Sequence, residues 1–203
     1  MKIGVVTHYM PPHQGGIERV ADMLFTAYTT HGFEVRWVSS RDPGHAPRRE
    51  GDRVRVPCWN ILEKRLGLPV PLWGLSALRE VSELARWADV LHVHDCLYPG
   101  SALGVVFGRW LGTPVVLSQH IGFVRYRAAA LRMIEHLAFA TLGCWLLRGA
   151  SRLALATPAA EAYVTQLLGT APRNACLVPN GIDTVRFHPV DSPERAIARR
   201  GLG

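Results

Sequence analysis

Short runs rich in Val, Ile and Leu alternate along this chain with longer stretches of helical character. Strands are expected at residues 2–7, 34–39, 53–57, 89–94, 114–119, 152–157 and 175–179. Alternation of this kind is typical of parallel strands joined by crossover helices. The sequence therefore predicts an α/β fold, a Rossmann-like doubly wound parallel sheet of about seven strands.

The stretch after the first strand repeats apolar residues at spacings of three and four. Its apolar face is expected to hold Ile17, Val20, Ala21, Leu24, Ala27, Tyr28 and His31. Glu18, Arg19, Asp22 and Thr29 are expected to face elsewhere, and Gly32 to end the helix. Further helices are expected at 75–88, 99–111, 126–148 and 158–168, and the polar stretch 41–53 is expected to form an exposed loop.

The loop "YMPPHQGGIERVADML" (residues 9–24) joins the first strand to the first helix. Pro11 and Pro12 are expected to hold it extended, and Gly15 and Gly16 permit a close backbone approach. Ligands of open parallel sheets bind at the carboxyl ends of the strands, and a helix N-terminus attracts phosphate. The loop is thus a candidate anion site, with a tight turn that binds no ligand as the alternative.

Polar side chains also end the fourth and fifth expected strands. His92 and His94 alternate with apolar residues, so both are expected on one face of their strand, with Asp95 directly after them. We favour a hydrogen-bonded core histidine over a zinc ligand for His92. His94 and His120 lie closer to the strand ends, and His120 is placed to donate a hydrogen bond to a sugar hydroxyl or to a backbone-like carbonyl in the cleft.

Several enzyme classes lose support because their motifs are missing. The chain has no GxxxxGK[ST], no GxSxG, and no third glycine that would complete a dinucleotide fingerprint. The net charge of +7 favours an anionic partner such as a nucleotide, a nucleic acid or an acidic lipid. The alternative is that the arginine content reflects only the base composition of the gene.

The four cysteines and the N-terminus indicate which cellular compartment to expect for the chain. Cys58, Cys96, Cys144 and Cys176 are widely spaced, which favours reduced and mostly buried thiols in the cytoplasm over a zinc site or a disulfide. The start of the chain shows no secretion signal. The apolar stretch 137–147 is too short to span a bilayer and is expected to be a core helix. Contact with a membrane is the alternative, because Arg125, Arg127, Arg132 and Arg148 flank it.

Four segments, in this order and spacing, carry a family resemblance. They are "MPPHQGGIERVADMLFTAYTTHGFEVRWVSS", "ADVLHVHD", "PVVLSQHIG" and "LVPNGIDTVRFHP". Together they resemble the N-terminal, acceptor-side half of family 4 retaining glycosyltransferases of the GT-B fold. The resemblance implies transfer of a sugar from a UDP- or GDP-linked donor to a sugar or lipid-linked acceptor, in cell-envelope polysaccharide or glycolipid synthesis. It implies no cofactor, no metal, no nucleic acid, and a cytoplasmic enzyme, with peripheral contact at the inner face of the membrane as an alternative.

The resemblance also implies roles for particular residues. Gly15 and Gly16 correspond to the loop that faces the donor diphosphate, and His120 to the catalytic histidine beside the transferred sugar. The cleft is expected to include His13, Glu18, His94, Asp95 and Asn180. Gly181 and Asp183 are expected to form the hinge, with a tight turn of positive φ at Asn180–Gly181.

The family has a second domain that binds the donor, and residues 1–203 do not contain its motifs. We therefore expect an N-terminal domain at 1–180, the hinge and the start of the second domain at 181–203, and little or no activity of these residues alone. The alternatives are a noncatalytic sugar or nucleotide binder, a subunit that requires a partner chain, and half of a related nucleotide-sugar 2-epimerase.

Overall fold

The structure is a computed structural model that describes residues 1–13, 15–41, 48–61, 70–120, 122, 126–184, 187, 189, 195, 197, 199 and 200. The strands are β1 (Lys2–Val6), β2 (Glu34–Ser40), β3 (Arg49–Glu50), β4 (Arg53–Val56), β5 (Cys58–Trp59), β6 (Leu72–Trp73), β7 (Val90–His94), β8 (Val115–Gln119), β9 (Arg152–Leu155) and β10 (Ala175–Leu177). The helices are α1 (Gly16–Thr30), α3 (Ser76–Trp87), α4 (Pro99–Leu111), α5 (Ala129–Ala138), η1 (Phe139–Gly143), α6 (Cys144–Gly149) and α7 (Pro158–Leu168).

Eight of these strands form one sheet in the order β10-β9-β8-β7-β1-β2-β4-β3. Every neighbouring pair is parallel except β3 and β4. The chain moves outward from β1 to β2 and β4, then returns to β7 on the other side of β1 and continues through β8, β9 and β10. The sheet is therefore doubly wound, as predicted, and its switch point lies between β1 and β7.

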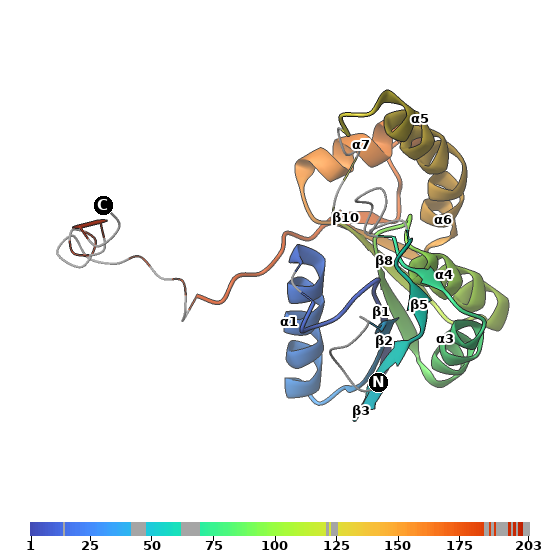
Figure 1. Cartoon of the computed structure of the whole chain (residues 1–203), viewed down its shortest axis with the longest axis vertical. Helices are drawn as coiled ribbons and strands as arrows, with labels where there is room; N and C mark the ends of the chain where they lie inside the picture. The colour runs from blue at the N-terminus through green and yellow to red at the C-terminus, as the bar shows by residue number, and fades with distance from the viewer. Residues whose placement is uncertain are drawn as a thin grey trace.

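Helices cover both faces of this sheet (Figure 1). Val5 and Trp37 point to the face covered by α1, where they pack with Ala21. The next residue in each strand, Val6 and Val38, belongs to the other cluster, which contains residues of α3, α4 and α6. Neighbouring strand residues thus point into two separate apolar layers, which explains why the strands are apolar at almost every position.

The seven expected strands are all present, but two sequence expectations on this part of the chain were wrong. Of the stretch 41–53, residues 42–47 lie outside the described residues, but residues 49–50 form the antiparallel edge strand β3, so the stretch is not only a loop. In α1, Glu18 is buried rather than turned away from the core, whereas Ala27 and His31 are exposed. Gly32 does follow the helix, with φ of 80°, and its N–H bonds to Thr29 O.

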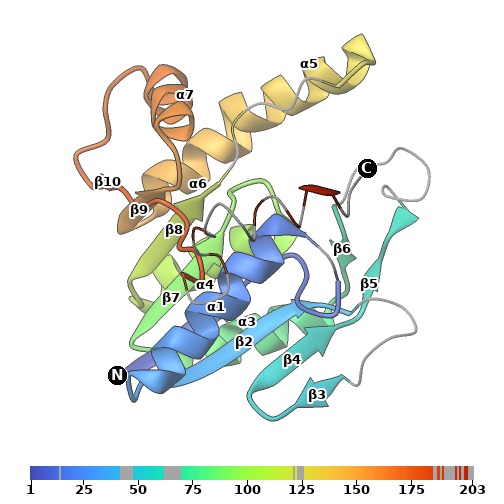
Figure 2. The same ribbon diagram turned by 90° about the vertical axis from the view of Figure 1, so that its left-hand side faces the viewer.

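The expected helix at 126–148 forms a single rod of three parts. It begins with α5, passes through the π-helical turn η1 and ends in α6. Leu146 and Leu147 are buried, so the prediction of a core helix is correct for α6. It is wrong for the outer side of the stretch 137–147, where Leu137, Leu142 and Trp145 are exposed. Helix α5 has no buried residue and extends beyond the sheet (Figure 2).

Candidate functional site

The switch point of the sheet brings together most of the polar side chains singled out in the sequence. Residues His8 and His13 follow β1, Glu18 lies in the first turn of α1, and His94 and His120 end or follow β7 and β8. β1 pairs with β7, with Val6 opposite Val93, so the residues that follow these two strands lie next to each other. In a doubly wound sheet this is the position at which ligands bind.

The two glycines of the first loop differ in the space around their Cα atoms. A Cβ on Gly15 would lie 2.0 Å from Glu18 Oε2, so this position excludes a side chain. A Cβ on Gly16, the first residue of α1, would meet nothing within 4 Å. Pro11 and Pro12 form a turn, so the prediction of an extended segment was wrong. The N-terminus of α1 is consequently open on the side of Gly16.

Glu18 is a buried carboxylate held between two histidines. Its Oε1 atom lies 3.1 Å from His8 Nε2 and 3.2 Å from His13 Nδ1. Burial acts to raise the pKa of Glu18, but the interactions with His8 and His13 act in the opposite direction, and the net effect lowers the pKa. Glu18 is therefore ionised at neutral pH although it is buried, and its partners explain why it faces inward.

Two further aromatic residues complete this part of the site. The ring of Tyr98 stacks on His8 at 3.9 Å with an interplanar angle of 5°, and Tyr9 stacks on His13 at 4.0 Å. Burial raises the pKa of Tyr98, so it remains a neutral phenol. Sequence reasoning missed His8 and Tyr98. Their positions gave a usable signal, since His8 directly follows an expected strand and Tyr98 immediately precedes the proline that starts α4.

His92 is a core histidine with both ring nitrogens in hydrogen bonds, which confirms the sequence prediction. Its Nδ1 atom lies 3.1 Å from Tyr28 Oη and its Nε2 atom 2.7 Å from Ser118 Oγ. Burial, with a smaller contribution from the charge of His120, lowers the pKa of His92 to about 4. The ring of His94 lies 4.4 Å away on the same face of β7, as expected.

His94 and His120 form a second pair of rings. His94 Nδ1 lies 2.9 Å from His120 Nε2, and the two rings are parallel to within 4°. Burial lowers the pKa of both, that of His94 well below its usual range. Both imidazoles are therefore neutral at pH 7, and one nitrogen of the pair donates a hydrogen bond to the other.

Side-chain hydrogen bonds also connect the ends of β7 and β8. Asp95 Oδ1 accepts a hydrogen bond from the backbone N–H of His120 at 2.8 Å. In the reverse direction, Gln119 Oε1 accepts from the backbone N–H of Cys96 at 3.1 Å. Asp95 adopts a φ of 54°, and its own N–H donates to Ser118 O. These bonds fix the backbone from which the His120 ring projects.

The residues after β10 reach the site only in part. Asn180 is exposed, and its side chain interacts with His120 in a way that acts to raise the pKa of that ring. A Cβ on Gly181 would lie 4.0 Å from Met23 Cε of α1. The prediction of a tight turn here was wrong, since neither Asn180 nor Gly181 has a positive φ. Asp183 is exposed, and its carbonyl accepts from the N–H of Phe187.

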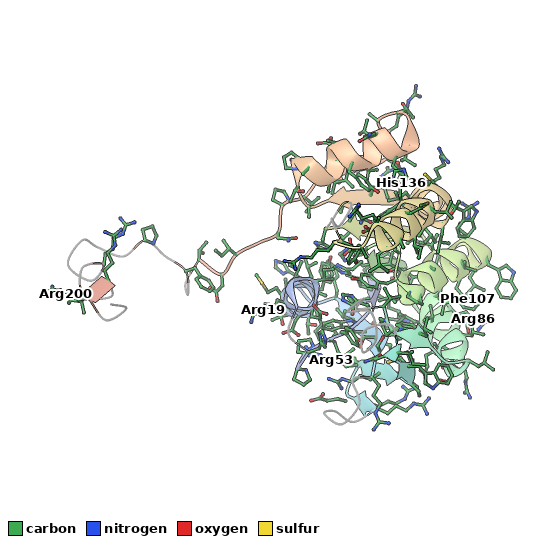
Figure 3. The ribbon with its side chains drawn as sticks, turned by 45° about the horizontal axis from the view of Figure 1, so that its top comes forward. Arg19, Arg53, Arg86, Phe107, His136 and Arg200 are labelled. Carbon is green, nitrogen blue, oxygen red and sulfur yellow. The ribbon has the colours of Figure 1, made fainter. Side chains whose placement is uncertain are left out.

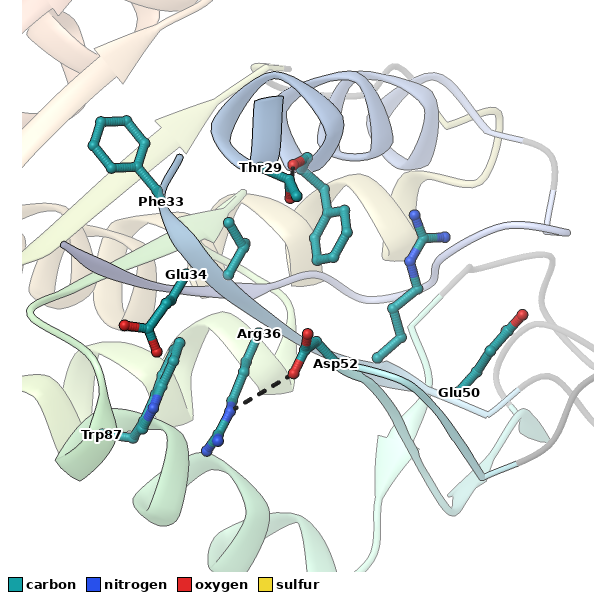
Figure 4. A pocket seen from close by; sticks show the side chains of 10 residues that line it. Thr29, Phe33, Glu34, Arg36, Glu50, Asp52 and Trp87 are labelled. Atoms are coloured by element: carbon teal, nitrogen blue, oxygen red, sulfur yellow. Dashed lines mark hydrogen bonds and ion pairs between the residues drawn. The ribbon is translucent and has the colours of Figure 1, made fainter. Parts of the chain in front are cut away.

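A pocket of about 350 Å³ lies elsewhere, at the amino ends of the strands (Figure 4). Its walls include Glu34 at the start of β2 and Trp87 at the end of α3. Arg53 pairs there with Asp22 at 2.7 Å, and Arg36 lies 4.3 Å above the Trp87 ring. This is the edge opposite to the one that binds ligands in such sheets.

Metal ligation and thiol chemistry are not features of the described site. Among the residues that the structure describes, no group of three or more His, Cys, Asp and Glu could hold a metal ion. Cys96 and Cys144 are buried, Cys58 is half-buried and Cys176 is exposed, so the expectation of mostly buried thiols is correct for two of the four. Burial raises the pKa of the Cys96 thiol, which keeps it protonated.

Comparison with known proteins connects this geometry to a family. The model of the family described as Glycosyltransferase Family 4 matches residues 14–186. The chain belongs to glycosyltransferase family 4. It is 26% identical to a glycogen synthase of Mycobacterium tuberculosis over an alignment of 214 residues, and this alignment covers 92% of this chain and 50% of the relative. It is 33% identical over 141 residues to a D-inositol 3-phosphate glycosyltransferase of Acidothermus cellulolyticus, covering 67% of this chain and 30% of that one.

Solved structures agree with the fold of this family 4 domain. Anabaena HepE in complex with UDP matches 100% of this chain and 50% of its own, with a TM-score of 0.64 and 15% identity. The UDP-GlcNAc 2-epimerase of Methanocaldococcus jannaschii matches 89% of this chain with a TM-score of 0.51 and 14% identity. The chain thus spans half or less of the length of these proteins, and it has the fold of one half of a GT-B glycosyltransferase.

Proposed function

We propose that this domain is the acceptor-side half of a retaining glycosyltransferase that moves a sugar from a nucleotide-sugar donor to an acceptor. The observation that carries the proposal is the position of His120 and the open start of α1 at the same switch point, in a chain of family 4. The solved structures of HepE contain UDP and UDP-glucose, which supports a nucleotide-sugar donor here as well.

The open end of α1 would receive the donor diphosphate. Backbone N–H groups in the first turn of a helix lack helical partners and carry a partial positive charge. Gly16 presents this end without a side chain, while the Glu18 carboxylate lies against Gly15 and is held by two histidines. An anion would therefore approach from the side of Gly16, away from the Glu18 carboxylate.

His120 would contact the transferred sugar. Its ring is neutral at pH 7 and only partly exposed, so it can donate or accept a hydrogen bond without adding charge beside the reacting carbon. His94 lies behind it and sets its orientation, with Asp95 holding the backbone. His13 and Asn180 would border the same cleft. Catalysis of this kind depends on positioning and on stabilisation of the leaving diphosphate.

The domain alone would hold the donor on one side only. The relatives are about twice as long, and the proposal assigns most of the donor contacts to a second domain. We therefore expect little or no turnover when residues 1–203 are incubated with UDP- or GDP-sugars and candidate acceptors. Robust turnover would contradict the requirement for a second domain.

Binding can be tested on the same chain by NMR. Addition of UDP-glucose or a GDP-sugar should shift the backbone amide signals of Gly15, Gly16 and His120, whereas uridine should leave the two glycines unchanged. Signals that respond only elsewhere would refute the assignment of the diphosphate site. Specific binding with no activity after addition of a donor-binding domain would indicate a noncatalytic binder. Release of an epimerised sugar would indicate a 2-epimerase.

A further inference from the structure

Two arginines of β4 point to the face of the sheet that α1 covers. They are Arg53 and Arg55, and they alternate with Val54 and Val56, which belong to the apolar cluster on the other face. Arg53 is half-buried, whereas Arg55 is only 3% exposed. A guanidinium remains charged inside a protein, so its burial is unfavourable unless it is hydrogen-bonded. Arg55 thus places a buried positive charge on the side of α1.

The Arg55 guanidinium connects the sheet to the loop before α1. Its Nη2 atom donates a hydrogen bond to the carbonyl oxygen of Pro11 at 3.1 Å. Pro11 and Pro12 have no backbone N–H, so this part of the loop can be held only through its carbonyls or its side chains. The Nη1 atom of Arg55 lies 3.2 Å from Glu50 Oε2 on the edge strand β3. Arg55 therefore bonds the edge of the sheet and the loop at the same time.

The turn that contains Pro11 leads directly to the start of α1. The N–H of His13 donates to the carbonyl of Met10 at 3.2 Å, which closes the turn around Pro11. His13 Nδ1 in turn lies 3.2 Å from the Glu18 carboxylate, which packs against Gly15. A shift of Pro11 would therefore carry His13 with it and disturb the carboxylate that lies against the first glycine.

Stability alone does not account for a buried arginine at this position. The side chain of Glu50 is 62% exposed, and an ion pair with so exposed a carboxylate contributes little to stability. Replacement of a buried ion pair by apolar side chains of similar volume is often neutral or stabilising. The bond to the Pro11 carbonyl is thus the contact of Arg55 that an apolar residue would not reproduce.

We propose that Arg55 is a positioning residue for the diphosphate site at the start of α1. It holds the Pro11 carbonyl, and through the turn it keeps Gly15 and Gly16 where an anion can reach the helix terminus. Its positive charge also favours an anion at this edge of the sheet. Arg55 acts through the loop and not by contact with the donor. The role rests on the proposed function, because it concerns the loop assigned to the donor diphosphate.

The test is an NMR titration of the chain with inorganic pyrophosphate, with the backbone amide signals of Gly15 and Gly16 as the readout. In the unmodified chain these signals should shift and reach saturation. Arg55→Met removes both the hydrogen bond and the charge, so it should raise the dissociation constant about tenfold. Arg55→Lys keeps the charge but has a single nitrogen in place of the planar fork, so it should raise the constant only about threefold.

The matched control is Arg53→Met, on the same strand and the same face. Arg53 Nη2 lies 2.7 Å from Asp22 Oδ1, within α1 itself. Figure 3 shows Arg53 on the flank of the domain that carries Arg19 of α1, away from Arg86 of α3. The control loses the same charge and a link to the same helix but leaves the Pro11 carbonyl bonded. Its dissociation constant should therefore change by less than about twofold.

The outcomes separate a positioning role from a structural one. A structural role alone would lower the stability of the Arg55 variants in urea denaturation without changing the dissociation constant of the folded protein. An unchanged constant in Arg55→Met, or an equal increase in Arg53→Met, would overturn the role of Arg55 and leave the diphosphate site in place. If Arg55→Met does not fold, Arg55→Lys and Arg53→Lys give the same comparison. Unresponsive Gly15 and Gly16 signals in the unmodified chain would instead refute the diphosphate site itself, and this role with it.

Discussion

The carboxylate of Asp95 accepts a hydrogen bond from the backbone N–H of His120 at 2.8 Å, across the ends of two neighbouring strands. Gln119 returns a bond of the same kind to the N–H of Cys96. The position of His120 is thus set by β7 and β8 together, rather than by the loop beyond it. This arrangement suits a residue that must meet a substrate in one orientation.

Replacement of Asp95 should test this link. Asp95→Ala removes the acceptor and leaves an alanine at a φ of 54°, so the free energy of unfolding should fall by about 2–4 kcal/mol. Asp95→Asn keeps an oxygen acceptor and a residue type that tolerates positive φ, so its free energy of unfolding should fall by about 1 kcal/mol or less. Urea denaturation of the two variants measures the difference. Equal losses would show that the bond to His120 contributes nothing beyond burial.

The two glycines of the first loop should respond differently to the same substitution. Gly15→Ala places a Cβ against the Glu18 carboxylate and should displace it from His8 and His13. The free energy of unfolding should fall by an amount on the order of 1–3 kcal/mol. Gly16→Ala meets open space at the start of a helix and should be neutral or slightly stabilising. Thermal denaturation of the pair provides the comparison, and a larger loss for Gly16→Ala would contradict the geometry.

Acid should destabilise the fold through His92. Its pKa is about 4 in the folded chain and about 6.5 when unfolded, so between these values the unfolded chain binds more protons. The resulting stability is complete above pH 6.5 and is lost progressively as the pH falls toward 4, by up to about 3 kcal/mol. His92→Gln should flatten this part of the pH profile in urea denaturation. A profile unchanged by the substitution would show that another group is responsible.

The Glu18 carboxylate should also contribute to the free energy of unfolding, with a different dependence on pH. Its folded pKa lies below the usual value of 4.5, so its contribution is present above that pH and is lost as the pH falls through the folded pKa. Glu18→Gln should therefore be less stable at pH 7, on the order of 1 kcal/mol, with a difference that narrows below pH 4.5. A constant difference across the whole range would contradict the role of its charge.

The sequence predicted the sheet well because strand apolarity is a local property. Residue patterns predicted all seven parallel strands, whereas the order of the strands, which places the switch point, comes from the structure. The edge strand β3 was missed because it has two residues and depends on pairing with β4. A periodic pattern does not report such nonlocal pairing.

The candidate site was predicted less completely for a related reason. Gly15, His94 and His120 were found because they lie at or after strand ends, whereas the inward position of Glu18 depends on His8, ten residues away. Helical periodicity treats a carboxylate as a surface residue unless its partner is known. The exposure of Leu137, Leu142 and Trp145 contradicted the expected core helix at 137–147, since an apolar stretch has the same pattern whether its side chains lie in the core or on the surface.

The π-helical turn at Phe139–Gly143 lets the long rod hold one extra residue while its two ends keep their angular relation. Each residue advances an α-helix by about 100°, so a wider turn of this kind holds one extra residue without twisting the helix beyond it. Deletion of one residue within 139–143 would rewind the turn to α-helix. The side chains of Met133 and Ile134 would then keep their orientation relative to Leu146 and Leu147, and the rod would be one residue shorter. A single-codon deletion could thus shorten the projecting end of the domain and leave both its surface and its interior in register.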